Sequence, residues 1–523
     1  MTDLLLEGGY RAVLALHLGA LALLSAWGLG RALRSLSPGE RAALSGLLVV
    51  GGLLAFSTPA RPVVYFDEFF YVSIARNMAT TGRAEPLLWQ GHPPELRRVG
   101  HFQPPYPQGW PFLLSLAVPP GTPPGAALDE PRAWDRAVPV GRLLLAALPA
   151  LAFLAGVRRF PLPVAAAGSA ALLALPTVLH LAGSDAAECG ALFFLALSAT
   201  ALSGFLRQPT GPGLGWLVLA ATAAAEMRPE GLLVVPALLA VAAPAARELS
   251  RGTRLAWLAV AAALAFPPVA VMAGHDPTLA HHFEATPRAG FTPWGNRLAN
   301  LANNARFFLD GRLWPLPMSL LALAGLAEAR RPGNRALALV PAAWLGAVTL
   351  FLSWYPFGDY GAVNSLDTWR FAHHAVLPMG LLAALGATAL VRAGRLPALA
   401  AAGLLGLALL APWTHRGFME APHPLEPLGE LAGQVARQRE GRLVVVEAPE
   451  YACYLREGFG LPAVLAPVPR VPPSGMLLFA VDEGRDLPDP EAWGRSDLVP
   501  WALERRSVPA AAVFELRPAP GGP

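Results

Sequence analysis

The sequence predicts an all-α polytopic membrane protein of about twelve transmembrane helices, followed by a small C-terminal α/β domain. Of its 523 residues, 54% are hydrophobic and only 15% are charged, whereas a soluble globular protein carries about 25% charged residues. Apolar stretches of roughly 15–22 residues recur along most of the chain, and such stretches approach or reach the length that a transmembrane helix needs. From residue 413 onward the hydropathy falls, and the remaining roughly 110 residues have the size of a small domain.

Two apolar spans, near residues 10–33 and 41–58, precede a long proline-rich segment at about 58–139. Ten further spans are expected near 138–157, 164–181, 188–206, 213–227, 231–246, 255–273, 313–326, 336–354, 371–391 and 396–412. The two spans on either side of residues 227–230 are both short. A broken helix pair that dips toward the outer face is therefore an alternative to two full spans there. Residues 1–412 are therefore expected to form the membrane domain.

Arginine supplies all the fixed positive charge, because the sequence contains no lysine. On the predicted topology every second loop is rich in arginine: 31–41, 158–159, 207, 247–254, 330–335 and 392–395. The positive-inside rule places such loops in the cytoplasm. Both termini, the 58–139 segment and the C-terminal domain are then expected on the external, periplasmic side of the inner (plasma) membrane. The N-terminus lacks a basic region before its first apolar span, so this span is expected to be a retained helix.

Several function classes are disfavoured by what the sequence lacks. Two cysteines and no CxxC motif exclude a disulfide framework and a cysteine-based zinc site. No GxGxxG or Walker loop is present to hold a nucleotide, so no nucleotide cofactor is expected. The net charge is only +4 and the arginines are scattered, which is unlike a nucleic-acid-binding surface.

The C-terminal segment, 413–523, shows the patterning of a small α/β domain. Short runs of buried-strand type occur at 442–447, 476–481 and 510–516, and residues 429–440 are typical of a helix. No catalytic motif is visible in this segment. Its role is left open by the sequence.

The segment from Tyr65 to Gly82 organises the rest of the chain. Read as a helix, it places apolar residues four positions apart on one face: Phe66, Phe70, Ile74 and Met78. Asp67 and Tyr71 share a neighbouring face, and Gly82 is suited to end the helix. The pattern predicts a helix at the membrane surface with two acids at its N-terminal end. An ordinary helix start is the alternative, since the helix dipole favours acids there. A second interfacial helix is expected at 108–118.

Many polar residues fall on the predicted outer side: Asp67, Glu68, Asp185, Glu188, Arg228, Glu230, His275, Asp276, His281, His282, Asp367 and Arg370. Polar groups at a membrane face are costly and are therefore functional candidates. The set predicts an external polar site. His281 and His282, with neighbouring acids, have the ligand types of a divalent metal site; a solvated loop is the alternative reading.

Five motifs in order resemble the GT-C glycosyltransferases, especially the branch of protein O-mannosyltransferases and aminoarabinose transferases. They are Asp67-Glu68 with Tyr71, Arg76-Asn77 and Gly82; His101-Phe102-Gln103-Pro104-Pro105; Gly141-Arg142-Leu143; Met227-Arg228-Pro229-Glu230; and Arg370 through Pro378. The resemblance covers roughly residues 60–390. An extra N-terminal span and the C-terminal segment depart from the family pattern.

The resemblance implies an inverting glycosyltransferase that moves a sugar from a polyprenyl-phosphate donor to a protein, lipid or glycan acceptor. It implies Asp67 as the base, with Glu68 as the alternative, and Asp185 and Glu188 as assisting acids, sometimes acting through a divalent metal. Arg228 and Arg370 are candidate ligands of the donor phosphate, since guanidinium binds phosphate oxygens bidentately. The remaining substrate-binding candidates are Tyr71, Arg76, His101 and Glu230.

Two other classes remain open. Intramembrane carboxylates and arginines also serve as coupling sites in transporters and lipid flippases. Such proteins usually contain repeated halves, and no internal repeat is visible here. A scaffold or assembly protein whose C-terminal segment binds a partner is the third reading. The long proline-rich external segment favours the enzyme.

Overall fold

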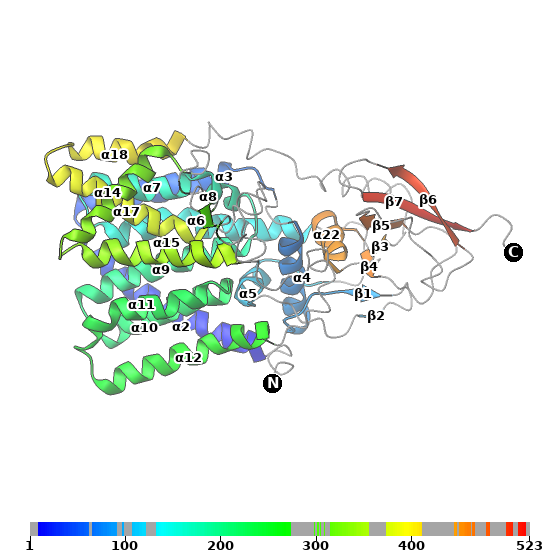
Figure 1. The fold of residues 1–523 in the computed structure, drawn as a ribbon. Helices are drawn as coiled ribbons and strands as arrows, with labels where there is room; N and C mark the ends of the chain where they lie inside the picture. The colour runs from blue at the N-terminus through cyan, green and yellow to red at the C-terminus, as the bar shows by residue number, and fades with distance from the viewer. Residues whose placement is uncertain are drawn as a thin grey trace.

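The computed structural model describes residues 9–61, 65–90, 97–98, 107–121, 132–273, 298, 301–302, 304, 308, 314–354, 373–410, 444–446, 449–461, 463–465, 477–481, 498–505 and 511–518. The described chain forms a helix bundle that is joined through a thin layer of helices to a mixed β-sheet (Figure 1). Helices α4 (Tyr65–Thr81) and α5 (Gly109–Ser115) lie in that layer, between the bundle and the sheet.

The bundle is built from long apolar helices. Its members are α2 (Tyr10–Arg34), α3 (Pro38–Ser57), α6 (Ala133–Gly156), α7 (Leu162–Ala174), α8 (Pro176–Ala182), α9 (Ala187–Arg207), α10 (Gly211–Met227), α11 (Gly231–Ala246), α12 (Arg251–Ala273), α14 (Leu316–Ala327), α15 (Arg335–Trp354), α17 (His373–Arg392) and α18 (Ala398–Gly406). Short 3₁₀ turns, η4 (Glu328–Arg330) and η6 (Leu407–Leu410), follow α14 and α18.

The chain is a multi-pass membrane protein. Within the described residues, six helices are long and apolar enough to cross a membrane, or seven if α7 and α8 form one bent span. The expected number of twelve is not confirmed, because helices such as α11 are shorter than a full span. The expected span at 164–181 is two helices that meet at an angle of 61°. The expected pair around 227–230 is formed by α10 and α11, which run side by side (Figure 1).

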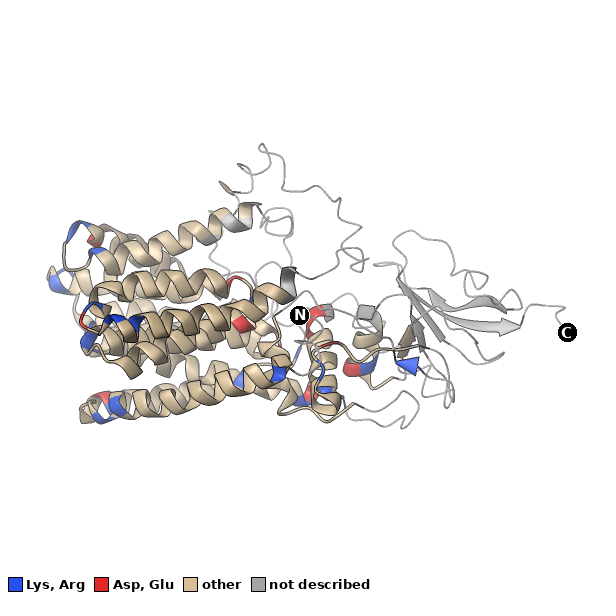
Figure 2. Ribbon diagram, turned by 90° about the horizontal axis from the view of Figure 1, so that it is seen from below, with Lys and Arg blue, Asp and Glu red and all other residues tan. Residues whose placement is uncertain are grey.

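Arginine-bearing loops gather at the end of the bundle that lies farthest from the sheet (Figure 2). There Arg158 pairs with Glu40 at 3.0 Å, and Arg31 donates to Gln208. The α2–α3, α6–α7 and α9–α10 loops are thereby held together. Ser37 and Glu40 also form a capping box that starts α3.

Small residues allow the closest helix contacts. Gly325 of α14 and Gly386 of α17 face each other so tightly that a Cβ atom on either would overlap backbone atoms of the opposite helix. Gly51 of α3 lies in the same way against the carbonyl of Ala146 in α6. Such contacts are typical of membrane helices, where close packing takes over part of the role that the hydrophobic effect has in water.

A row of polar contacts joins α2 to α10. The Tyr10 hydroxyl donates to the carboxyl group of Glu226, and His17 Nε2 lies 3.0 Å from the carbonyl oxygen of Leu219. Further along, Trp216 Nε1 donates to Ser25 Oγ at 3.0 Å. Hydrogen bonds of this kind stabilise neighbouring helices inside a membrane. The first span is therefore an integral part of the bundle.

Among the described residues, the sheet has seven strands in the order β2-β1-β4-β3-β5-β7-β6. Five come from the C-terminal segment: β3 (Val444–Val446), β4 (Ala463–Leu465), β5 (Leu477–Val481), β6 (Leu498–Arg505) and β7 (Ala511–Pro518). The strands expected at 442–447, 476–481 and 510–516 coincide with β3, β5 and β7. The helix expected at 429–440 lies outside the described residues, and α22 (Pro449–Phe459) follows β3.

Two strands of this sheet come from the segment between α4 and α5. Strands β1 (Trp89–Gln90) and β2 (Arg97–Arg98) pair with each other, and β1 pairs in parallel with β4 through Gln90 and Leu465. The C-terminal segment and the first long loop therefore share one sheet. This sharing places α22 next to α4 (Figure 1).

Candidate functional site

Helix α4 carries the two adjacent acids and is almost entirely enclosed. It runs over the predicted residues and ends at Gly82, whose positive φ of 81° suits glycine. Glu68 is fully buried, whereas Asp67 is partly exposed. The structure does not describe the side chains of Tyr65 and Phe66. The other three residues of the predicted apolar face, Phe70, Ile74 and Met78, are buried. The helix start brings two carboxylates to the junction between bundle and sheet.

Glu68 and Asp185 share one hydrogen-bond donor. Trp134 Nε1, in the first turn of α6, donates to Glu68 Oε2 at 3.2 Å and to Asp185 Oδ1 at 2.7 Å. The backbone N–H of Asp185 also donates to Glu68 Oε2 at 3.3 Å. Asp185 lies in the turn between α8 and α9, so three distant segments meet at this indole. The two carboxylates form a buried acid pair.

The environment of the acid pair favours a proton on it. Burial raises the pKa of Asp185 well above its usual range, and the neighbouring charge of Glu68 raises that pKa further. The hydrogen bond from Trp134 acts in the opposite direction but is the weaker effect. Two carboxylates this close cannot both ionise readily. Burial and the mutual charge of the two carboxylates therefore favour a proton shared by the pair.

Arg228 is the centre of a second polar cluster, at the junction of α10 and α11. Its Nη1 lies 3.5 Å from Glu188 Oε1, and its Nη2 lies 3.1 Å from Glu230 Oε1. Asp67 and Tyr71 of α4 also lie close enough to add to the negative potential at the guanidinium. Burial alone lowers the pKa of Arg228, but the carboxylates outweigh it and hold this pKa well above its usual value.

A histidine pair adjoins the Arg228 cluster. His373 and His374 begin α17, their ring centroids are 3.7 Å apart, and both are buried. His374 Nε2 lies 3.8 Å from Glu230 Oε2. Burial raises the pKa of Glu230, but Arg228 and His374 outweigh burial and keep it well below its usual value. Glu230 is therefore ionised between a guanidinium and an imidazole.

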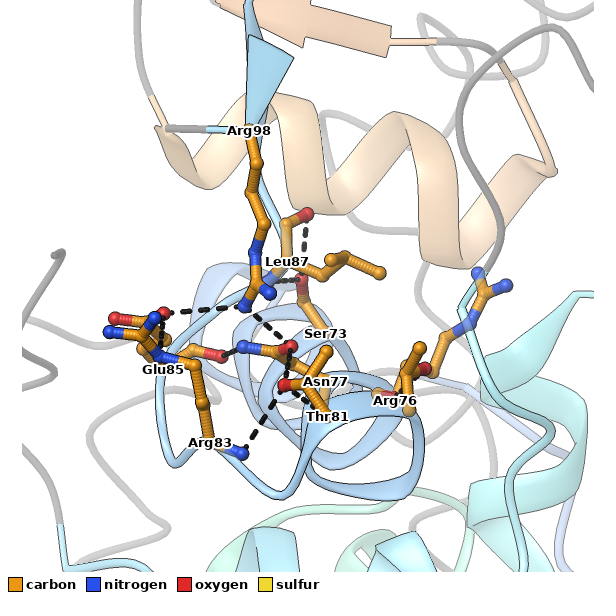
Figure 3. A network of polar contacts seen from close by, with 9 residues as sticks. Ser73, Arg76, Asn77, Thr81, Arg83, Glu85, Leu87 and Arg98 are labelled. Carbon is orange, nitrogen blue, oxygen red and sulfur yellow. Dashed lines mark hydrogen bonds and ion pairs between the residues drawn. The ribbon is translucent and has the colours of Figure 1, made fainter. Parts of the chain in front are cut away.

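The other side of α4 is held by a polar network (Figure 3). Asn77 Nδ2 donates to the carbonyl of Glu85 at 2.7 Å, and Asn77 Oδ1 accepts from Arg98 Nη2 at 2.6 Å. The Glu85 carboxylate also accepts from Arg83 and Arg98. Arg98 belongs to β2, so the network ties α4 to the sheet. These residues position the helix on the side away from the acid pair.

Arg76, predicted to bind substrate, is buried and engaged with protein groups. Its Nη1 lies 2.7 Å from Glu457 Oε2 of α22, and both side chains are at most 1% exposed. Its Nη2 donates to the carbonyl of Pro120 at 3.4 Å. The guanidinium thus joins α4 to the C-terminal segment.

The remaining sequence-predicted site residues lie outside the described ranges: His101, Arg370, His281 and His282. Among the residues that are described, no group of three or more His, Cys, Asp or Glu side chains is arranged to hold a metal ion. Glu68 and Asp185 supply only two carboxylates, and the guanidinium of Arg228 lies between Glu188 and Glu230. The described side chains therefore do not fit a metal site on their own.

The structure brings together five predicted residues in one place and adds two that the prediction missed. These five are Arg228 and the four residues that lie around its guanidinium, Asp67, Tyr71, Glu188 and Glu230. Trp134 was missed because its only signal is a tryptophan just before a membrane span. His374 stands inside the motif from Arg370 to Pro378, but the motif alone does not single it out.

This chain is similar to known proteins in its fold. No protein-family model and no curated protein matches the sequence. The fold is similar to ArnT from Cupriavidus metallidurans in its apo state, with a TM-score of 0.52 and 14% identity over 91% of this chain and 97% of that chain. The oligosaccharyltransferase of Archaeoglobus fulgidus, in its apo form, aligns with a TM-score of 0.48 and 11% identity over 80% of this chain and 63% of that chain. This similarity shows that the chain has the same kind of fold as ArnT, in agreement with the fold that the sequence resemblance implies.

Proposed function

We propose that this chain is a membrane glycosyltransferase that moves a sugar from a polyprenyl-phosphate donor to an acceptor at the α4 end of the bundle. The observation that carries the proposal is the placement of a partly exposed carboxylate, Asp67, near the charged guanidinium of Arg228. Transfer of a sugar from a phosphate requires a base at the acceptor and positive charge at the leaving phosphate. The ArnT-like fold supports this assignment.

The proposed reaction is a single displacement. The oxygen of an acceptor hydroxyl attacks the anomeric carbon of the donor sugar, and Asp67 accepts the hydroxyl proton. The bond between the anomeric carbon and the phosphate oxygen breaks, and the polyprenyl phosphate leaves with the electron pair. Arg228 stabilises the charge on the phosphate oxygens. Attack opposite the leaving group inverts the anomeric centre.

Asp67 fits the role of base better than Glu68. Glu68 is fully buried, and its Oε2 already accepts from Trp134 and from the backbone of Asp185. Asp67 is partly exposed at the helix start and lies close enough to Arg228 to help raise its pKa. We assign a structural role to Glu68 and Asp185, which hold α4, α6 and the α8–α9 turn in place relative to one another. Asp67 is then the acid that contacts the acceptor hydroxyl.

Donor binding has to change the partners of Arg228. The guanidinium of Arg228 is already engaged by Glu188 and Glu230 and lies near Asp67. A phosphate therefore replaces at least one carboxylate at the guanidinium. His374, 3.8 Å from Glu230, is suited to take over as the hydrogen-bond donor to Glu230. Arg370 is retained as a proposed ligand of the donor phosphate, and His101 as a proposed substrate-binding residue.

The site is proposed to lie on the periplasmic side of the inner membrane, since the arginine-bearing loops gather at the other end of the bundle (Figure 2). Protein, lipid and glycan acceptors remain open. A divalent metal bound near His281 and His282 is a separate proposal, and no step of the reaction above uses it. Metal analysis of the purified protein before and after His281→Ala and His282→Ala tests that site.

A panel of radiolabelled polyprenyl-phosphate sugars, incubated with the purified protein and candidate acceptors, tests the function. We expect transfer from one class of donor, and loss of that transfer in Asp67→Asn. Binding of a lipid-linked sugar without transfer to any acceptor, together with its movement across proteoliposome membranes, would replace the enzyme by a transporter or flippase.

A further inference from the structure

Helix α22 of the C-terminal segment packs directly against the catalytic helix α4. The ring of Tyr454 meets the ring of Phe69 edge-on, with centroids 5.2 Å apart. Gly458 lies so close to Phe69 that a Cβ atom there would come within 2.7 Å of the ring. Phe69 directly follows Glu68 in the chain. The contact therefore acts one residue away from the acid pair.

Phe69 also lies next to Trp134, the hydrogen-bond donor that the two acids share. Its ring lies 6.1 Å, centroid to centroid, from the ring of Trp134. Trp134 Nε1 is the donor that both Glu68 and Asp185 accept. A continuous row of packed rings thus runs from Tyr454 through Phe69 to Trp134. Its far end is the indole that binds both carboxylates.

Three further contacts fix α22 to the elements around the site. The buried ion pair between Glu457 and Arg76 joins it to α4. Arg456 Nη1 donates to the carbonyl of Leu87 at 3.3 Å, and the Leu87 N–H donates to Ser73 Oγ of α4 at 3.0 Å. The guanidinium of Arg132, just before α6, lies 5.5 Å from the ring centre of Phe459. Helix α22 therefore bridges α4, the segment before β1 and the start of α6.

We propose that α22 is a positioning element of the acidic site, in which Tyr454 and Glu457 set the place of α4 and of the Trp134 indole relative to Glu68 and Asp185. The inference rests on the proposed glycosyl transfer. It gives the C-terminal segment a role in the reaction although none of its described residues lies at the reacting atoms. Because a displacement of about 1 Å costs up to ~10²-fold in rate, loss of these contacts acts on the chemical step.

The test compares Tyr454→Leu with Tyr454→Phe. The leucine variant removes the ring that packs on Phe69, whereas the phenylalanine variant keeps it. We expect kcat for sugar transfer to fall about 10- to 10²-fold in Tyr454→Leu, with KM for the lipid donor nearly unchanged. Tyr454→Phe is expected to retain kcat. A thermal melt of each variant in detergent shows that the fold persists.

A second pair of variants tests the ion pair between Arg76 and Glu457. Glu457→Gln removes the carboxylate that pairs with the buried Arg76, whereas Arg76→Gln with Glu457→Gln removes both charges of this pair. Removing one partner of a buried pair is more disruptive than removing both. We expect the double variant to recover part of the kcat that Glu457→Gln loses.

Hydrogen exchange of the α4 amides, residues 68–81, supplies a readout that does not depend on activity. Faster exchange in Tyr454→Leu together with lower kcat supports the inference. Faster exchange with unchanged kcat makes α22 a purely structural contact and overturns it, as does unchanged exchange. If the wild-type protein transfers no sugar, the proposed function fails, and the exchange measurement alone then supports or overturns the docking of α22 on α4.

Discussion

Asp67 and Glu68 are neighbours in the chain but face different partners. Side chains of adjacent helix residues leave the axis about 100° apart. Glu68 accepts hydrogen bonds from Trp134 and from the backbone of Asp185, whereas Asp67 lies close enough to Arg228 to help raise its pKa. Substitution of Asp67 and substitution of Glu68 are therefore expected to affect sugar transfer differently.

Asp67→Asn should lower single-turnover sugar transfer by about 10²–10⁴-fold, the usual effect of removing a general base. The amide keeps the size of the side chain but cannot accept the acceptor proton. The protein should keep its melting temperature and still bind the lipid donor. Near-normal transfer by this variant would remove Asp67 from the role of base.

Glu68→Gln is expected to act mainly on Asp185. The charge of Glu68 helps to raise the pKa of Asp185, so its removal lowers that pKa. The variant should lose less transfer than Asp67→Asn, and its pH–rate profile should change shape. If Glu68→Gln loses more transfer than Asp67→Asn, then Glu68 and not Asp67 is the base.

Trp134→Phe removes the donor that Glu68 and Asp185 share. Loss of a hydrogen bond to a buried polar group costs about 1–3 kcal/mol, and here both carboxylates lose the indole as a donor. We expect the free energy of unfolding to fall by at least this amount and transfer to fall with it. Trp216→Phe is the matched control, since that buried indole donates to Ser25 Oγ in the contact between α2 and α10 and not to the acid pair. Equal losses in the two variants would show that the acid pair does not depend on the indole.

Helix α4 and its end at Gly82 could be read from the sequence, because four-residue periodicity and a C-terminal glycine are local signals. The sharing of one sheet by β1, β2 and β4 could not, since strands of two or three residues have no periodicity to detect. The docking of Glu457 on Arg76 joins residues 381 positions apart. Only the folded chain brings such residues together.

Some residues of the candidate site could be predicted from the sequence, and others could not. The acids at 67, 68, 185, 188 and 230 stood out because charge is rare in an apolar chain. Trp134 did not, since a tryptophan at the end of a membrane span is common at the interface. The pairing of Arg228 with two carboxylates is likewise a tertiary property. The sequence motif gives the arginine but not its partners.

Arg228→Lys tests the phosphate assignment. Lysine keeps the charge but loses the planar fork that reaches Glu188 and Glu230 together. A hydrogen bond to a charged group contributes about 1.5–3 kcal/mol, so donor affinity should fall about 10- to 100-fold. Arg207→Lys, at the end of α9, is the control. Unchanged donor binding in Arg228→Lys would leave this arginine as a structural partner of the two acids.

Asp185 is expected to make stability fall as the pH rises. Its pKa is raised in the folded protein, so the proton binds more tightly there than in the unfolded chain. The stabilisation is complete below the unfolded value of about 3.9 and is lost as the pH rises through the folded pKa. Melting temperatures in detergent should therefore fall over this window in the wild type. Asp185→Asn should flatten the curve, and an unchanged slope in this variant would assign the pH dependence to other groups.

The orientation of the chain can be tested at two exposed positions. Ala117, just after α5, belongs to the α4 end, and Gly333 lies in an arginine-bearing loop with open space around it. Both native cysteines, Cys189 and Cys453, are buried and give little background. We expect a membrane-impermeant maleimide to label Ala117→Cys in intact cells and Gly333→Cys only after the membrane is opened. The positive-inside rule requires this pattern. The reverse pattern would move the acidic site to the cytoplasmic side and would exclude a periplasmic transfer reaction.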